Sequence, residues 1–191
     1  TPMKSKETLR KTILAKRKFI DPQDIEHNST RITKTLSHLP ILKKAQTILT
    51  YLAKPQEADT TKLIQWAQNK GKTVYTPITA SNATLHWTRL PNSYTLKNGP
   101  FGIPVPTQLN IADPPPDAPI IIPCVAFAEN GDRIGHGAGY YDRFLAQHRG
   151  PKIAIALETQ HVPDFPPDSH DIKMDAIITE SNTYLITDAL E

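Results

Sequence analysis

Apolar residues follow two patterns along this chain, short continuous runs and longer segments with helical spacing. The runs at 118–128 and 152–158 are apolar almost throughout, which is typical of strands buried on both faces of a sheet. Segments with helical spacing separate the runs, and Gly71 marks the end of one of them. We expect helices at about 5–20, 29–39, 59–70 and 140–149, and strands at 45–53, 72–78, 83–90, 118–128, 152–158, 174–180 and 183–188.

The alternation of strands and helices predicts the α/β fold class, with a largely parallel sheet and helices on both faces. We expect three layers and a single domain over 1–191, with a glycine- and proline-rich turn at 98–106. Residues 1–4 are expected to be disordered or left over from expression, because Thr1 and Pro2 precede Met3. In open sheets of this class, ligands gather at the carboxyl ends of the strands.

The segment 131–144 is the most informative one, because it places three alternating glycines between an apolar run and an amphipathic segment. Gly135, Gly137 and Gly139 can adopt backbone conformations closed to other residues and can let a ligand approach main-chain N–H groups. Such groups at the start of a helix favour an anion. The segment matches neither the P-loop nor the dinucleotide-binding pattern. It therefore predicts a phosphate-binding loop of another kind, with Arg133 before it and an aromatic pair after it.

Composition narrows the possible ligands and the compartment. Hydrophobic residues make up 38% of the chain and charged residues 21%, with a net charge of +3, which suits a small anionic ligand. The lysines are dispersed, so we expect no nucleic acid, and no apolar run approaches the length of a membrane span. Cys124 is the only cysteine and is expected to be a buried, inert thiol. A single cysteine excludes an intrachain disulfide, and we expect a cytoplasmic monomer.

The first predicted helix carries an unusual group of cations. At about 100° per residue, Lys6, Arg10 and Arg17 fall within a stripe roughly 40° wide, beside the apolar stripe that contains Leu9 and Ile13. The cations could extend around the edge of the core into solvent. Alternatively, the helix could lie beside the glycine loop and bring positive charge to phosphates.

Several carboxylates stand near predicted strand ends, and their roles stay open at this point. Glu57 follows one strand and could either belong to the first turn of a helix or bind N–H groups of a ligand. Asp175 opens a strand and could simply mark its edge. His170 and Asp171 could belong to a metal site or to a polar loop. Ligand spacing typical of zinc is lacking.

Taken in order, these residues resemble the 5-formyltetrahydrofolate cyclo-ligase family over nearly the whole chain. The motif from Gly131 to Arg143 is specific, whereas the opening helix alone is weak. Two positions depart from the family pattern, namely Val105 and Ala128. The other matching positions are Lys6, Leu9, Arg10, Arg17, Glu57, Asp59, Thr60, Gly71, Lys72, Phe101 to Pro104, Pro123 to Phe127, Gln160, His170, Asp171 and Asp175.

The resemblance implies an ATP-dependent ligase of one-carbon metabolism that closes 5-formyltetrahydrofolate, with or without a polyglutamate tail, to 5,10-methenyltetrahydrofolate. ATP is the co-substrate, and Mg²⁺ bridges its phosphates. The implied catalytic residues are Arg10, Arg133 and Tyr140. The implied ATP-binding residues are Lys6, Glu7, Thr8, Leu9, Arg10, Arg17, Arg133, Ile134, Gly135, His136, Gly137, Ala138, Gly139, Tyr140 and Tyr141. The implied substrate-binding residues are Leu52, Glu57, His136, Gly137, Ala138, Gly139 and Tyr140, and the implied metal ligands are Asp142 and Asp175.

Two other functions are compatible with the same segments. A non-catalytic module of this fold would bind a nucleotide, a folate or RNA, but it would not need Glu57, Asp142, Lys6 and Arg10 together. A sugar-phosphate isomerase on a similar sheet would need neither ATP nor a cationic opening helix. The sequence therefore favours the ligase.

Overall fold

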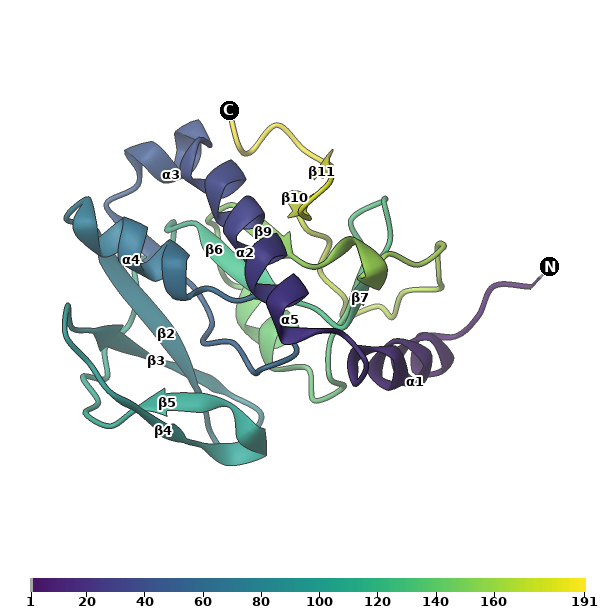
Figure 1. Ribbon diagram of the computed structural model, residues 1–191, viewed down its shortest axis with the longest axis horizontal. Helices are drawn as coiled ribbons and strands as arrows, with labels where there is room; N and C mark the ends of the chain where they lie inside the picture. Colours follow the sequence, from purple (N-terminus) through teal and green to yellow (C-terminus); the bar gives the residue numbers. More distant parts are fainter. Residues whose placement is uncertain (1) are drawn as a thin grey trace.

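The computed structural model describes residues 2–191, and Thr1 lies outside the described residues. A seven-stranded sheet has the order β11-β10-β9-β6-β1-β2-β3 (Figure 1). The five inner strands are parallel, and the edge strands β11 and β3 are antiparallel to their neighbours. The strands are β1 (Thr47–Leu49), β2 (Thr73–Thr79), β3 (Leu85–Leu90), β6 (Ile120–Pro123), β9 (Lys152–Ile155), β10 (Ala176–Ile178) and β11 (Thr183–Leu185).

Helices cover both faces of this sheet, as the sequence predicts. Alternate residues of β6 point to opposite faces: Ile121 packs with helices α2, α3 and α4, whereas Ile120 packs with α5. Figure 1 shows α2, α3 and α4 lying together over one face. No helix in residues 2–191 is long and apolar enough to cross a membrane. The bounds are α2 (Pro22–Ser37), α3 (Pro40–Lys44), α4 (Thr61–Asn69) and α5 (Tyr140–Leu145).

Helix α1 (Lys6–Arg17) packs at the carboxyl end of the sheet and not on either face. Its buried residues Leu9 and Ile13 join a separate apolar cluster with Val125, Ile134 and Phe165. The Ser5 side chain caps the helix by accepting the N–H of Thr8. Residues 2–4 precede it without regular structure.

The apolar run 118–128 is two strands, and the expectation of a single strand was wrong. Strand β6 ends at Pro123, and β7 (Ala126–Phe127) pairs instead with β8 (Arg133–Ile134) in a separate hairpin. Between them, the side-chain amide of Gln160 donates to the carbonyl oxygens of Cys124 and Val125. These carbonyls are therefore satisfied outside any sheet, which lets the chain turn toward the glycine loop.

Other differences concern element ends. The second helix begins at Pro22 and not near residue 29, because Asp21 caps it and proline suits the first helical position. The turn region 98–106 contains a short hairpin, β4 (Leu96–Asn98) with β5 (Pro104–Pro106), around the 3-10 turn Pro100–Gly102. A second 3-10 turn spans Glu158–Gln160.

Candidate active site

A large cavity lies where the order of the strands reverses. Strand β2, which follows β1 in the chain, lies on one side of β1, and the later strand β6 lies on its other side. In open sheets, ligands bind outside the carboxyl ends of the strands at such a reversal. The cavity volume is about 1480 Å³. Ligand pockets are commonly about 300–1,000 Å³, so this one has room for two ligands. Residues that follow β1, residues that follow β8, the start of α1 and the 168–172 segment line it.

The glycine loop forms one wall of this cavity. Gly137 has a φ of +107° and Gly139 a φ of +73°, and Gly139 directly precedes α5. Side chains at these two positions would be strained. The segment from Gly135 to Tyr141 lines the cavity without interruption. The loop thus presents main-chain groups at the start of a helix.

Helix α1 lies beside this loop, which is the placement that the second interpretation of its cationic stripe expects. The Arg10 Nε donates to the carbonyl oxygen of Gly135 at 2.8 Å. The remaining guanidinium nitrogens lie 3.8 and 3.9 Å from the point where a Cβ on Gly137 would stand. Lys6 and Arg10 both line the cavity, so this end of the helix contributes positive charge to the site.

Other residues of α1 in the implied ATP site do not line the cavity. Glu7 is exposed and pairs with Lys11, and Thr8 contacts Ser5 at the helix cap. Leu9 belongs to the apolar cluster, as does Ile134 of β8. Arg17 is only 3% exposed and does not line the cavity either. Of the three cations on this stripe, Lys6 and Arg10 therefore line the cavity, whereas Arg17 at the end of the helix is buried and does not.

Lys6 is held by acidic residues of the 168–172 segment. Its Nζ lies 2.7 and 2.8 Å from the carboxylate oxygens of Asp171 and 3.4 Å from Asp168. Asp171 is mostly buried and lines the cavity. The sequence left its role open between a metal site and a polar loop, and the structure places it at the site.

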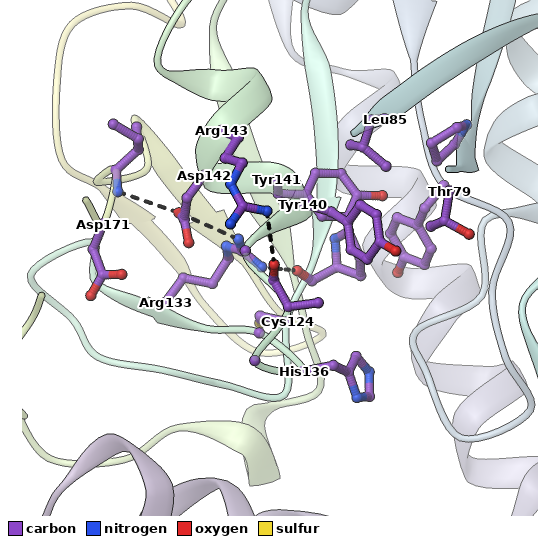
Figure 2. Close-up of a pocket in the computed structure, with 18 of the residues that line it drawn as sticks. Thr79, Leu85, Cys124, Arg133, His136, Tyr140, Tyr141, Asp142, Arg143 and Asp171 are labelled. Atoms are coloured by element: carbon purple, nitrogen blue, oxygen red, sulfur yellow. Dashed lines mark hydrogen bonds and ion pairs between the residues drawn. The ribbon is translucent and has the colours of Figure 1, made fainter. Parts of the chain in front are cut away.

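Arg133 and Asp142 lie side by side at the base of the glycine loop (Figure 2). Arg133 is buried, donates to the carbonyl oxygen of Pro123 at 3.0 Å, and has its guanidinium 5.5 Å from the ring centre of Tyr141. Its Nη2 lies 3.7 Å from Asp142 Oδ1, which also accepts the N–H of Ile172 at 3.4 Å. Because Ile172 follows Asp171 in the chain, this contact brings the Asp142 carboxylate next to the acidic segment.

Asp175 does not share the cavity with Asp142. It precedes β10, at the amino end of that strand, and both of its carboxylate oxygens are occupied. One accepts the N–H of Lys152 and the other the hydroxyl of Thr187, each at 2.8 Å. The structure therefore does not bring the two expected metal ligands together. Residues 2–191 contain no group of three or more acidic, histidine or cysteine side chains arranged to hold a metal.

The opposite wall of the cavity follows β1. Glu57 is 7% exposed, and its Oε1 accepts the N–H of Lys54 at 2.8 Å. Burial raises the pKa of Glu57, while the Lys54 hydrogen bond and the charges of Arg17 and Lys54 oppose that rise. Leu52 lines the same wall. A buried carboxylate beside apolar surface suits a flat ligand that presents N–H donors.

Aromatic and imidazole rings stand at the junction of the two walls. The Tyr140 hydroxyl donates to the carbonyl oxygen of Ala80 at 3.2 Å, and burial raises the pKa of Tyr141. Figure 2 shows these two rings next to Thr79 and Leu85, with His136 on the opposite side. Burial lowers the pKa of His136, and the nearby positive charges of Lys54, Arg17, Arg10 and Arg133 lower it further, to about 4. His136 is thus neutral near pH 7.

Lys54 and Phe101 are among the cavity residues that sequence reasoning did not assign to the site. Lys54 was passed over because a lysine in a proline-containing loop has no motif of its own. Phe101 was named as part of a turn and of the family pattern but was given no role, yet it lines the cavity, is 73% exposed and has a φ of +59°. An exposed aromatic residue in a strained backbone conformation is typical of a functional position. The Gly-Pro-Phe-Gly sequence is the signal that could have indicated it.

The fold and the cavity define an α/β protein in which a glycine loop and a buried carboxylate line opposite walls of one cavity. Comparison with known proteins identifies the family. A model described as the 5-formyltetrahydrofolate cyclo-ligase family matches residues 2–180. The chain belongs to this family.

Individual relatives agree with this assignment. The chain is 30% identical over 186 residues to a 5-formyltetrahydrofolate cyclo-ligase of Escherichia coli, covering 90% of this chain and 98% of that protein. A probable 5-formyltetrahydrofolate cyclo-ligase of Caenorhabditis elegans is 27% identical over 190 residues, covering 92% and 91%. Among solved structures, the 5,10-methenyltetrahydrofolate synthetase of Aquifex aeolicus superposes with a TM-score of 0.81 at 31% identity, covering 96% of this chain and 93% of that one.

Proposed function

We propose that this protein closes 5-formyltetrahydrofolate to 5,10-methenyltetrahydrofolate with ATP, releasing ADP and phosphate. Family membership and the names of the relatives support the reaction. The observation that carries it is the contact between Arg10 and Gly135, which joins the cationic helix to the glycine loop. The same cavity also contains the buried carboxylate of Glu57, so both reactants have a place in it.

The chemistry proceeds in two displacements. The formyl oxygen on N5 attacks the γ-phosphorus, the new O–P bond forms, the bond to the β-phosphate oxygen breaks, and ADP leaves. N10 then attacks the formyl carbon, the C–O bond breaks with loss of phosphate, and the N10 proton is released. Phosphorylation converts a poor leaving group into a good one. The protein needs no nucleophile, only alignment and stabilisation of developing charge.

The cavity residues divide between the two reactants. Main-chain groups of the loop from Gly135 to Gly139, together with Lys6, Arg10 and Arg133, bind the phosphates of ATP. Glu57 accepts hydrogen bonds from the pterin, and Leu52 packs against it. The Tyr140 ring contacts both ligands where they meet, with His136 beside it.

Mg²⁺ fits the acidic groups at the phosphate end. Magnesium is usually bound by one or two carboxylates together with substrate phosphates. Asp142 and Asp171 both line the cavity, and we assign them this role in place of Asp142 with Asp175. The ion neutralises phosphate charge when it is bound. Asp171 also holds Lys6, so one carboxylate serves both the cation and the metal.

The direct test is turnover of purified protein with 5-formyltetrahydrofolate and Mg-ATP, followed by the near-ultraviolet absorbance of the methenyl product. We expect product that depends on all three components, with one ADP formed per product. Binding of both ligands without product would indicate the non-catalytic module. Isomerisation of a sugar phosphate without ATP would indicate the third candidate.

The cytoplasmic location, the monomeric state and the lack of nucleic-acid binding stay predictions. Cell fractionation, sedimentation and a gel-shift assay with RNA test them in turn.

A further inference from the structure

The Lys54 side chain lines the cavity from the wall that follows β1. Its main-chain N–H donates to Glu57 Oε1 at 2.8 Å, which holds this residue next to the buried carboxylate. The side chain is partly buried. Within residues 2–191, its Nζ makes no hydrogen bond or ion pair with another residue, unlike Lys6. A partly buried cation without a partner indicates a site for an anion.

The charge of Lys54 reaches both walls of the cavity. Burial raises the pKa of the Glu57 carboxyl and lowers that of the His136 imidazole, and the charge of Lys54 opposes the first shift and adds to the second. Among the charges that act on His136, Lys54 contributes the most. Lys54 and the glycine loop line the same cavity, so the ammonium of Lys54 shares that space with the loop although its backbone belongs to the opposite wall. A flexible four-carbon stem allows that reach.

We propose that Lys54 is a catalytic residue whose ammonium binds the phosphoryl group as it passes from ATP to the formyl oxygen. This inference rests on the proposed function. Glu57 holds the folate and the glycine loop holds the nucleotide, so the group that moves between them crosses the region that Lys54 occupies. The ammonium stays protonated and stabilises charge on the phosphoryl oxygens while the bond to ADP breaks and the bond to the formyl oxygen forms.

Substitution by methionine tests this assignment, because methionine keeps much of the side-chain volume and removes the charge. For Lys54→Met we expect kcat to fall roughly 100-fold, as on removal of a preorganised donor in other enzymes. The KM for 5-formyltetrahydrofolate should change less than about 3-fold, since Glu57 and Leu52 remain. Lys54→Arg should recover most of the activity. The matched control is Lys44→Met, an exposed lysine of α3, which should behave as wild type.

Nucleotide binding supplies a measurement that does not depend on turnover. Only a γ-phosphate would reach Lys54, so Lys54→Met should weaken binding of a non-hydrolysable ATP analogue about 10-fold. Its affinity for ADP, measured by calorimetry, should not change. Equal loss for both nucleotides, or no loss for either, would overturn the proposal.

The position of the ammonium can be tested in the ligand-free protein. Histidine NMR should show a higher pKa for His136 in Lys54→Met than in wild type, where it is about 4. A His136→Asn variant assigns the resonance among the seven histidines of the chain. An unchanged pKa would place the ammonium away from the loop and reject the proposal. If this pKa and the analogue affinity both change but the wild type makes no methenyl product, the proposed function fails and the anion site stands.

Discussion

The two walls of the cavity are built in opposite ways. Glu57 and Lys54 are three residues apart, and one turn after β1 holds them together. In contrast, Arg10 meets Gly135 across 125 residues, and Lys6 meets Asp171 across 165. The wall that contains Lys54 and Glu57, here called the strand-end wall, therefore forms together with β1. The wall that contains Lys6, Arg10 and the glycine loop, here called the phosphate wall, forms only once α1 has packed against the β7–β8 hairpin. We infer that the folate end is locally preorganised and that the nucleotide end depends on helix packing.

The largest expected effect comes from the strand-end wall. Glu57→Ala should lower kcat/KM for 5-formyltetrahydrofolate roughly 100-fold, since truncating one partner of a buried charged hydrogen bond costs about 2–5 kcal/mol. Its affinity for ADP should stay within about 2-fold of wild type, because the glycine loop is built from other elements. Steady-state kinetics and calorimetry give the two numbers. If ADP affinity fell as much as kcat/KM, the two walls would not be independent.

The next effect concerns the phosphate wall. Arg10→Ala should raise the KM for ATP about 10-fold to 30-fold, which is the lower end of the range of about 1.5–3 kcal/mol for hydrogen bonds to charged groups. The KM for folate should change much less. Lys11→Ala, on the exposed side of the same helix, is the matched control. Equal changes in both KM values would mean that the Arg10–Gly135 contact is structural.

A smaller effect separates the two aspartates that the sequence could not tell apart. Asp171→Asn should raise the Mg²⁺ concentration needed for half-maximal activity by at least about 10-fold, since even residues outside the first coordination shell have effects of that size. Asp175→Asn should leave the Mg²⁺ requirement unchanged, because Asp175 does not line the cavity. A magnesium titration of activity measures both. The reverse outcome would restore Asp175 as the ligand.

The smallest effect is on folding stability and comes from His136. Its pKa is about 4 in the folded protein, below its ordinary value near 6.5, because burial and the nearby cations disfavour the charged imidazole. A depressed folded pKa contributes stability above the unfolded pKa, and this contribution is lost as the pH falls from about 6.5 through 4. His136→Asn should therefore lose less stability than wild type over that interval. Thermal melts at several pH values measure this, and parallel curves would contradict it.

Parts of the site that lie close together in sequence could be predicted. The three glycines, the tyrosine pair and Asp142 occupy one short segment, and the order of apolar run, glycines and amphipathic segment placed them at the start of a helix. Glu57 could be placed at a strand end for the same reason. The structure does not place Asp175 at the cavity, and its position before β10 looks the same in sequence whether its oxygens face a cavity or the neighbouring backbone.

The sequence by itself determined the α/β class, the parallel sheet and the glycine loop, because periodicity, glycine conformation and local order act over a few residues. Tertiary structure alone decided which cations of α1 line the cavity, that Arg17 is buried and does not line it, and that Asp171 accompanies Asp142. It also decided that the Lys54 side chain faces the cavity. These outcomes depend on how α1, β6 and the 168–172 segment pack together at the point where the strand order reverses. Packing between segments that are distant in the chain leaves no periodic signal in the sequence.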